Sequence, residues 1–290
     1  MDERELLRRS GGPVTQDRLG RELRDLGLGT GDTVMFHTRM SALGWVAGGT
    51  QAVIGALLDV VGPRGTLMVT CGWNDALPYE FPTWPRAWQD AVRAHHPAYD
   101  PLLSEADHAN GRLPEALRRR PGAVRSRHPD ASFAALGADA HALMADHPWD
   151  HPHGPGSPLA HLVEARGKVL MLGAPLDSFT LLHHAEALAD APGKRFVEFE
   201  QPITVDGKRV WRRFRDIDSS DGAFDYSGVV PADVEWPFTA IARDMLAAGI
   251  GTSGTTGAAT SHLFDAADAT RFGVAWMESK LTAAGATPGP

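Results

Sequence analysis

Cysteine is almost absent from this sequence of 290 residues, with Cys71 as its single example. One thiol excludes an internal disulfide framework and a zinc site built from several cysteines. Lysine is scarce as well, and no apolar run approaches the roughly 20 residues that a membrane span needs. The first residues are charged and lack the apolar segment of a signal peptide. We therefore expect a soluble, cytoplasmic protein.

Positive charge is also in deficit, because 36 acidic residues outnumber 28 basic ones and the formal net charge is -8. This balance argues against a nucleic-acid binder and suits a cationic ligand, if the acids cluster near a cleft. The alternative, that a modest negative charge only aids solubility, stays open. The length suits one large α/β domain or two small ones.

The N-terminal part of the chain predicts a β–α–β unit. Apolar strands are expected at 33–36 and 66–70, with a helix at 50–61 between them. An earlier helix at 15–26 has a threonine cap and a glycine stop. A β–α–β unit implies a parallel strand pair with a right-handed crossover, and it leaves the loop that starts at His37 at the carboxyl end of the first strand.

The segment 72–110 is rich in tryptophan, tyrosine, proline and acidic residues and has little clear periodicity. A long segment of this composition is more typical of a lid over a binding site than of a linker. Aromatic faces and carboxylates together suit an amine-bearing, hydroxylated ligand. The alternative is that its tryptophans pack under a long loop as a small hydrophobic cluster of their own.

Two polar stretches follow the lid segment. Residues 125–132 form a basic loop before a strand at 133–136, and their arginines and hydroxyls could hold phosphates, although a solvated turn is the simpler interpretation. Residues 147–153 contain histidines between prolines, but neither a cysteine nor a helix that would orient metal ligands. We therefore predict no metal site there.

The stretch 172–186 carries the strongest chemical signal. It begins at the end of an apolar strand, turns at a glycine and a proline, and continues as a helix that Asp177 or Ser178 can cap. That helix places His183 and Glu186 on one face, with Cβ atoms about 5–6 Å apart. A carboxylate at this spacing can hold an imidazole in one tautomer, as a general base requires. A plain surface pair on an amphipathic helix is the alternative.

The C-terminal part predicts a hairpin and then helices. Alternating strands are expected at 196–204 and 209–214, joined at Asp206-Gly207. Several aspartates follow, but their spacing does not fit a calcium loop. Residues 251–259 are rich in glycine and threonine and lack the lysine of a phosphate-binding loop. A closing helix is expected at 266–283.

Together these elements predict an α/β fold in a single domain over residues 1–290. We expect a mixed, largely parallel central sheet flanked by helices. A lid-like insertion is expected at 72–110, and an antiparallel hairpin with its acidic turn at 196–226. The pattern leaves open whether the protein is a monomer or a homodimer.

Several motifs recur along the chain in a characteristic order. They are Gly31-Asp-Thr-Val-Met-Phe-His37, Ser41-Ala-Leu-Gly44, Gly48-Gly49, Val61-Gly-Pro-Arg-Gly-Thr66, Arg125-Ser-Arg-His-Pro-Asp-Ala-Ser132, Gly156-Ser-Pro158, Leu172-Gly-Ala-Pro-Leu-Asp-Ser-Phe-Thr-Leu-Leu-His-His-Ala-Glu186, Leu263-Phe-Asp265 and Phe272-Gly-Val274. In this order they resemble the aminoglycoside 3-N-acetyltransferases, a family of antibiotic N-acetyltransferases, from about Thr15 to about Lys280. The resemblance implies a mixed α/β fold and acetyl transfer from acetyl-CoA to the 3-amino group of the 2-deoxystreptamine ring of an aminoglycoside antibiotic, which confers resistance.

Roles for individual residues follow from the resemblance, from the loop at the carboxyl end of the first strand, and from the acidic side chains of the lid and hairpin turn. The expected catalytic group is His183 with Glu186, and with Asp218 and Asp216 as acidic partners. Acetyl-CoA is expected along His37, Thr38, Ser41, Ala42, Leu43, Gly44 and Thr180, with Arg125, His128 and Ser132 either nearer its phosphates or supporting that loop. The cationic antibiotic is expected to meet Asp75, Tyr79, Glu80, Glu105, Asp107, Asp216 and Asp221. No metal ion is expected.

The chemistry of the reaction agrees with these roles. A 3-ammonium group cannot attack a thioester until it loses a proton, and an oriented histidine can take that proton. Neighbouring helical residues lie about 100° apart, so His183 rather than His184 shares a face with Glu186. Direct transfer requires no covalent intermediate.

Other classes of protein stay open. A related acyltransferase could act on a different biosynthetic amine. A hydrolase or a covalent acyltransferase would use Cys71 or a serine as its nucleophile, and a non-catalytic or metal-binding protein could share the scaffold. Neither a nucleic acid nor a membrane is expected as a partner.

Overall fold

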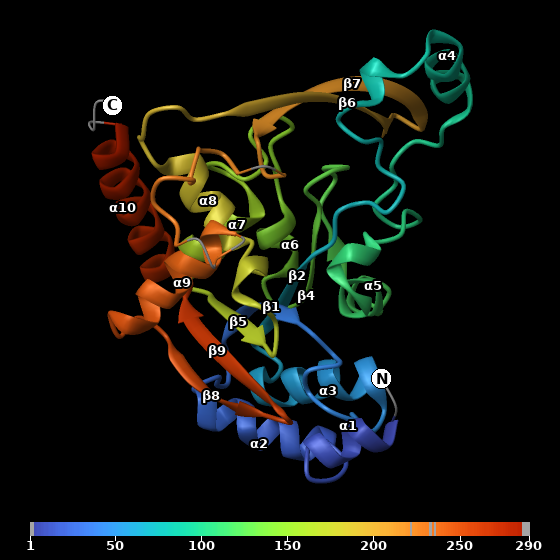
Figure 1. The fold of residues 1–290 in the computed structure, drawn as a ribbon. Coiled ribbons are helices and arrows are strands. Elements are labelled where there is room, and N and C mark those ends of the chain that lie inside the picture. The colour runs from blue at the N-terminus through green and yellow to red at the C-terminus, as the bar shows by residue number, and fades with distance from the viewer. Residues whose placement is uncertain (1–2, 221, 232–233, 235, 286–290) are drawn as a thin grey trace.

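A mixed seven-stranded sheet forms the centre of the computed structural model, which describes residues 3–220, 222–231, 234 and 236–285. Figure 1 shows the sheet in the middle of the molecule, with helices around it. Its strand order is β3-β4-β2-β1-β5-β9-β8. The strands are β1 (Thr33–Thr38), β2 (Thr66–Thr70), β3 (Val124–Arg125), β4 (Phe133–Gly137), β5 (Lys168–Leu172), β8 (Thr252–Thr256) and β9 (Ala259–Asp265).

The three central strands of this sheet are parallel. β1 pairs with β2 on one side and with β5 on the other, and Thr38 lies opposite Leu172. The predicted β–α–β unit is therefore confirmed, and so is a mixed sheet with a parallel centre. The outer strands pair antiparallel. Because β1 and β5 end side by side, the loop after β1 meets the turn after β5 at the sheet edge where ligands of α/β folds bind.

Helices cover both faces of the sheet, and alternate residues of the central strands enter two separate cores. On one face pack α2 (Gln16–Leu26), α3 (Gly49–Val61) and α5 (Arg112–Arg118). On the other pack α6 (Ala140–Met144), α7 (Pro158–Glu164), α8 (Leu181–Leu188), α9 (Pro237–Ala247) and α10 (Ala266–Gly285). α1 (Glu3–Arg9) and α4 (Arg86–His95) bury none of their residues.

The first of the covering helices, α2, begins and ends where the sequence predicts. The Thr15 hydroxyl accepts a hydrogen bond from the Arg18 amide at 3.2 Å, which satisfies one of the free amides of the first turn. Gly27 ends the helix with a φ of 111°, a conformation that glycine adopts without strain. Leu19 and Leu23 face the core and are fully buried.

The start of α8 differs from the prediction. Asp177 and Ser178 lie in a short 3-10 turn, η3 (Leu176–Ser178), and Thr180 occupies the N-cap position of α8 without a side-chain cap. The Ser178 hydroxyl instead donates to the Pro175 carbonyl at 2.7 Å. The predicted cap is therefore wrong, because the turn after Pro175 uses the serine for its own closure.

The predicted hairpin is present as β6 (Phe196–Val205) and β7 (Lys208–Ile217). Both of its turn residues, Asp206 and Gly207, have positive φ, at 50° and 72°, as the tight turn between two twisted strands requires. Figure 1 shows this hairpin as an arm above the sheet, with α4 near its tip.

The segment 72–110 packs on the hairpin. Trp211 of β7 donates from its indole nitrogen to the Arg93 carbonyl at 3.2 Å, and the Tyr99 amide donates to the Pro202 carbonyl of β6 at 2.8 Å. The segment also contains α4, which the sequence analysis does not predict although its apolar residues recur at helical spacing, as Ala87, Trp88, Ala91 and Val92.

The pair β8–β9 is a second element that the sequence pattern misses. Residues 251–259 are small and glycine-rich and have no strand prediction, yet they contain β8, which pairs with β9 at the edge of the sheet. Only the last residue of β8 is buried. An exposed edge strand shows no alternation of apolar and polar residues, so its sequence resembles a loop.

Candidate active site

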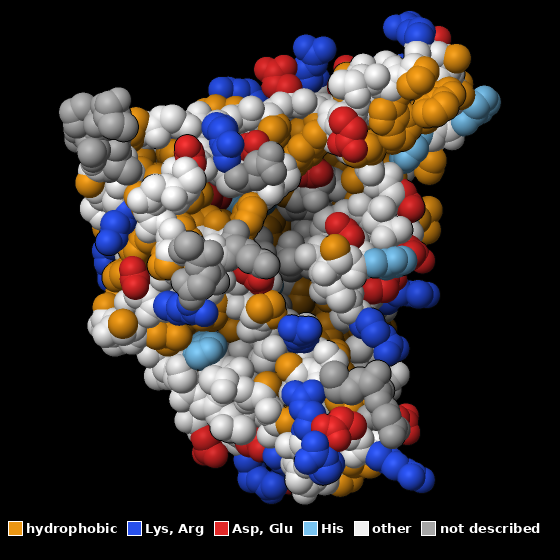
Figure 2. Space-filling model, in the orientation of Figure 1, with side chains coloured by type: hydrophobic (Ala, Val, Ile, Leu, Met, Phe, Trp, Pro, Cys, Tyr) orange, Lys and Arg blue, Asp and Glu red, His pale blue; other side chains and the backbone are white. Residues whose placement is uncertain are grey.

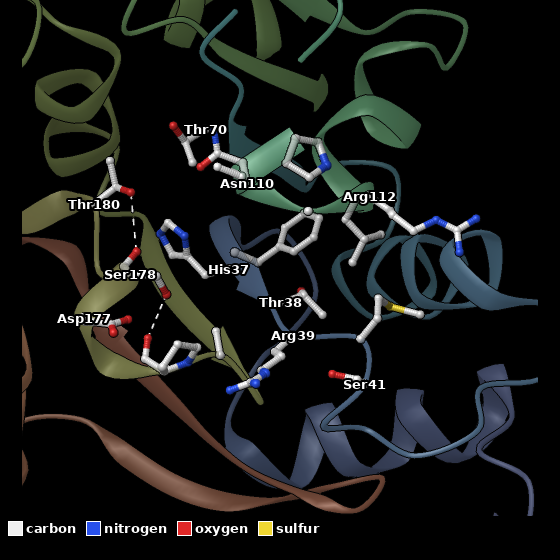
Figure 3. A pocket seen from close by; sticks show the side chains of 18 of the residues that line it. His37, Thr38, Arg39, Ser41, Thr70, Asn110, Arg112, Asp177, Ser178 and Thr180 are labelled. Atoms are coloured by element: carbon white, nitrogen blue, oxygen red, sulfur yellow. Dashed lines mark hydrogen bonds between the residues drawn. The ribbon is translucent and has the colours of Figure 1, made fainter. Parts of the chain in front are cut away.

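A cavity of about 640 Å³ lies at the carboxyl ends of β1 and β5. Three segments form most of its wall: the loop after β1, the turn after β5 and residues 109–114 at the start of α5. Figure 3 shows the labelled side chains of these segments around it. His183 and Phe238 line it as well. Figure 2 shows this face of the molecule hollowed between α9 and α5, beneath the hairpin.

His183 is joined to Glu186 at the wall of this cavity. Nδ1 of His183 lies 2.7 Å from Oε2 of Glu186. Because the carboxylate only accepts, the imidazole must carry its proton on Nδ1 when neutral, and Nε2 then has a free lone pair. The His183 side chain is 15% exposed and Glu186 is fully buried. Phe238 packs edge-on against the imidazole ring at 4.7 Å between centroids.

The Glu186 carboxylate is itself fixed by two further donors. Its Oε1 accepts from the Tyr226 hydroxyl at 2.7 Å and from the Ala223 amide at 3.2 Å. A buried carboxylate with three hydrogen-bond donors is oriented rather than free to rotate. The pair therefore has the geometry of an imidazole held in one tautomer and one orientation.

The neighbouring histidine faces elsewhere. Nδ1 of His184 donates to the backbone carbonyl of His153 at 2.7 Å, and burial lowers the pKa of His184. The prediction that His183, and not His184, shares a helix face with Glu186 is confirmed by these contacts.

A second imidazole–carboxylate pair lies beside the first. Nδ1 of His153 is 2.6 Å from Oδ2 of Asp216, and both side chains are almost fully buried. The ring of His153 is 5.3 Å from the ring of His183, centroid to centroid. Sequence reasoning missed His153 because its partner is 63 residues away. The only sequence signal is the histidine-rich stretch 147–153, for which the sequence predicts neither a metal site nor a proton acceptor.

The expected acidic partners of His183 need a correction. Asp216 bonds His153, and its other oxygen accepts from the Ile217 amide at 2.8 Å. Asp218 is half-buried and accepts from the amide and the hydroxyl of Ser220. The carboxylate on His183 is that of Glu186, because only the shared face of α8 brings a carboxylate to its Nδ1.

Tyr79 and Asp216, both expected to meet the antibiotic, lie close to the carboxylate of Asp130. Tyr79 donates its hydroxyl to Asp130 at 3.1 Å. Burial and the nearby charge of Asp216 raise the pKa of Asp130 to about 6, with a smaller contribution from Asp107. The sequence analysis assigns Asp130 no role in antibiotic binding, because its basic neighbours in residues 125–132 suggest phosphate binding instead.

The other expected antibiotic contacts are more peripheral. Asp75, Glu80 and Glu105 are exposed, and Glu105 pairs with His108 at 3.3 Å. Asp107 is half-buried and accepts from the Ala109 amide at 2.9 Å. Asp221 lies outside the described residues.

The residues expected to contact acetyl-CoA divide into two groups. His37, Thr38, Ser41 and Thr180 line the cavity. Nε2 of His37 and Oγ1 of Thr38 are buried without a hydrogen-bond partner in the described part of the chain, and burial lowers the pKa of His37 to about 4. A neutral imidazole and a hydroxyl that lack partners in the protein are available to a polar ligand.

The remaining residues of that loop form its support. Ala42 and Leu43 pack in the core on the α2–α3 face, and the Leu43 carbonyl accepts from the Ala258 amide at 2.9 Å. Gly44 has a φ of 93°, and a Cβ there would lie 2.5 Å from that of Ser10. These three residues hold the loop in place rather than line the cavity.

The basic loop lies away from the cavity wall. Arg125 donates from Nε to the Ser132 hydroxyl at 3.1 Å and from its terminal nitrogens to the carbonyls of Ser104 and Gly72. His128 and Ser132 are fully buried. The arginines that do line the cavity are Arg39 and Arg112, both exposed. The expected phosphate contacts of the basic loop therefore have no support in the geometry, which assigns Arg125 a structural role.

Replacing Arg125 with alanine is expected to destabilise the fold by at least about 2 kcal/mol, because hydrogen bonds to a buried charged group are lost and their carbonyl partners stay buried. Acetyl-CoA affinity should stay within about threefold. Denaturant unfolding and calorimetric titration measure the two quantities. The exposed neighbour Arg127 provides the control, since its replacement by alanine should change neither. A large loss of acetyl-CoA affinity with unchanged stability would restore the phosphate role.

His147 and His153, in the stretch 147–153, form hydrogen bonds within the protein. His147 lies 3.0 Å from the Ser126 hydroxyl and 2.9 Å from the Pro152 carbonyl. In the described residues no group of three or more histidine, cysteine, aspartate or glutamate side chains is arranged to hold a metal ion. Within the same residues no helix is long and apolar enough to span a bilayer.

Comparison with known proteins identifies the family. The family model for aminoglycoside 3-N-acetyltransferase matches residues 35–278. Aminoglycoside N(3)-acetyltransferase VII of Streptomyces paromomycinus is 75% identical over 281 residues, which cover 97% of each chain. The crystal structure of the aminoglycoside acetyltransferase AAC(3)-Xa superposes with a TM-score of 0.96 at 71% identity and covers 98% of this chain and 99% of that one.

Two similar structures contain ligands. AAC-IIIb in a binary complex with CoASH has a TM-score of 0.85 at 43% identity and covers 96% of this chain and 100% of that one. AAC-VIa bound to sisomicin has a TM-score of 0.85 at 40% identity, with coverage of 93% and 99%. By sequence and by fold, the chain belongs to the aminoglycoside 3-N-acetyltransferase family.

Proposed function

We propose that this protein transfers acetyl from acetyl-CoA to the 3-amino group of the 2-deoxystreptamine ring of aminoglycoside antibiotics and thereby confers resistance. The observation that carries the proposal is the hydrogen bond between His183, at the wall of the cavity, and the buried Glu186. The relatives support it, since they are named for this activity and one similar structure holds CoASH. In this reaction His183 acts as the general base on the acceptor amine.

Acetyl-CoA fits the cavity by the chemistry of its wall. The unpartnered Nε2 of His37 and Oγ1 of Thr38 suit the amide and carbonyl groups of the pantetheine arm. Arg39 and Arg112 line the same cavity, and guanidinium groups bind phosphates well. With the phosphates at these arginines, the arm runs inward along the loop after β1, toward His183.

The acceptor belongs on the opposite side of His183, near the hairpin. Asp130, Asp216 and Asp107 influence one another electrostatically there, and Tyr79 contacts the first of them. Asp218 at the end of β7 adds a further carboxylate. An aminoglycoside carries several ammonium groups, so a cluster of carboxylates under the lid provides both attraction and orientation.

A covalent mechanism through the single cysteine does not fit the structure. Cys71 is fully buried, and burial raises the pKa of its thiol to about 12. A thiol in this environment carries almost no thiolate at neutral pH and reaches no substrate. The burial of Cys71 supports direct transfer from thioester to amine as the proposed mechanism.

A free-thiol release assay with acetyl-CoA and a panel of aminoglycosides tests the function. Thiol release is expected with acceptors that carry a free 3-amino group, and NMR of the product should locate the acetyl group on that nitrogen. An acceptor already acetylated at this position serves as the control and should give no release. Release without any aminoglycoside, or acetylation at another nitrogen, would contradict the proposal.

A further inference from the structure

The stoichiometry of the proposed reaction raises a question about protons. An acceptor that arrives as an ammonium ion loses two protons from its nitrogen on the way to an amide. One ends on the sulfur of CoA, and the other must leave the site. A single imidazole holds only one transferred proton at a time, so removing both protons within the site takes either two acceptors or a release to water between the two steps.

The structure holds two imidazoles that could share this task. His183 and His153 lie with ring centroids 5.3 Å apart and planes tilted by 46°. Each uses Nδ1 to donate to a carboxylate, Glu186 and Asp216 respectively. Each is therefore fixed in the tautomer whose Nε2 accepts a proton.

The position of His153 is fixed from two directions. Asp216 holds its ring and is itself held by the Ile217 amide at 2.8 Å. Its backbone carbonyl accepts from Nδ1 of His184 at 2.7 Å. Because His184 lies next to His183 on α8, the helix that carries one imidazole also anchors the other.

Nε2 of each imidazole has no hydrogen-bond partner among the described residues. Neither of these two atoms is completely buried. Ring centroids 5.3 Å apart place the two imidazoles close enough for one acceptor nitrogen to approach both. An ammonium group bound there could give a proton to either ring.

We propose that His153 takes the first proton from the bound acceptor ammonium and His183 takes the second, an inference that rests on the proposed function. In the first step an N–H bond breaks, the proton moves to Nε2 of His153, and the electron pair stays on the acceptor nitrogen. That nitrogen then attacks the thioester carbon, and its second proton moves to Nε2 of His183. The C–S bond breaks, the sulfur takes the proton from His183, and His153 returns its proton to water.

The charges around His153 support this order. Burial disfavours a charged ring, but the carboxylates of Asp216, Asp130 and Glu186 outweigh it, and the pKa of His153 lies above its ordinary value. The neighbouring His128 and His147 are kept neutral by burial, which lowers their pKa values. His153 can therefore keep the first proton while His183 handles the second.

The pH dependence of His153→Asn tests the proposal. At about pH 6 the acceptor amine is almost wholly protonated, and kcat/KM should fall at least about 30-fold relative to the wild type. At about pH 9 much of the acceptor arrives as free amine, so the loss should shrink to within about threefold. Asp216→Asn should show the same trend, because it removes the charge that favours proton uptake by His153.

Two comparisons make the test specific. His183→Asn should lose activity to a similar extent at both pH values, because the second proton leaves only after the C–N bond forms. His151→Asn is the matched control: His151 lies in the same loop with a φ of 59°, which asparagine tolerates, and its ring packs on Phe196. Its pH profile should match that of the wild type.

A loss in His153→Asn that is equal at both pH values, or no loss at all, overturns the proposal. The unfolding free energy and the acetyl-CoA affinity of His153→Asn are measured as well, and they report a structural defect. Such a defect would lower kcat/KM equally at both pH values. Failure of the proposed function has a separate signature, since the wild type would then release no thiol with any aminoglycoside, and both proposals would fall. An active wild type with a pH-independent His153→Asn defect removes only the inference on His153.

Discussion

Replacing His183 with asparagine is expected to lower kcat at least about 100-fold, the usual scale for the loss of a general base. Asparagine can still donate an N–H to Glu186, so the local packing is retained while the basic Nε2 is lost. Steady-state kinetics at saturating acetyl-CoA and acceptor measure the effect. Because His183 contributes only part of the cavity wall, acetyl-CoA affinity should change by less than about threefold.

His184→Asn provides the comparison for that variant. His184 is buried and bonds the His153 carbonyl, so its replacement should cost about 1–2 kcal/mol of stability. The loss in kcat should be below about tenfold, since the ring reaches the reaction only through the backbone of His153. A crippling His184→Asn beside a mild His183→Asn would show that the base has been assigned to the wrong residue.

The parts of the fold that the sequence predicts are those with strong local signals. Thr15 and Gly27 delimit α2 because a cap and a left-handed glycine are local requirements of a helix. The Asp206-Gly207 turn is predictable for the same reason. By contrast, β8 and α4 have almost no buried side chains. β8 forms by pairing with β9, so its own small and glycine-rich residues do not reveal the strand.

In the candidate site, too, the sequence predicts the local contacts and misses those between distant segments. His183 and Glu186 are three residues apart on one helix, so the spacing alone predicts their contact. His153 and Asp216 meet only because the hairpin folds back over the loop before α7, and neither residue has a local signal for the other. For Arg125 the sequence leaves phosphate binding and support of the loop open, and its hydrogen bonds to backbone carbonyls favour support.

Glu186→Gln is expected to reduce kcat at least about 100-fold, through the tautomer of His183 rather than through loss of packing. Glutamine has the same volume but only one acceptor oxygen, and the Tyr226 hydroxyl and the Ala223 amide compete for it. Its amide nitrogen would then face Nδ1 of His183 as a donor. The imidazole is driven to carry its proton on Nε2, where it can no longer accept one from the acceptor amine.

Nitrogen-15 NMR of the His183 ring tests that cause directly, because the two tautomers have different shifts. In the wild type the neutral ring should carry its proton on Nδ1, and in Glu186→Gln on Nε2. Tyr226→Phe is the matched comparison, since it removes one hydrogen bond from Glu186 but keeps the carboxylate, and it should lower kcat less than about tenfold. Alkaline pH should not rescue Glu186→Gln, because deprotonating the acceptor does not restore the lone pair on Nε2. If Glu186→Gln keeps both the wild-type tautomer and wild-type turnover, the carboxylate only fills the core, and the orientation of His183 must come from the packing of Phe238 on its ring.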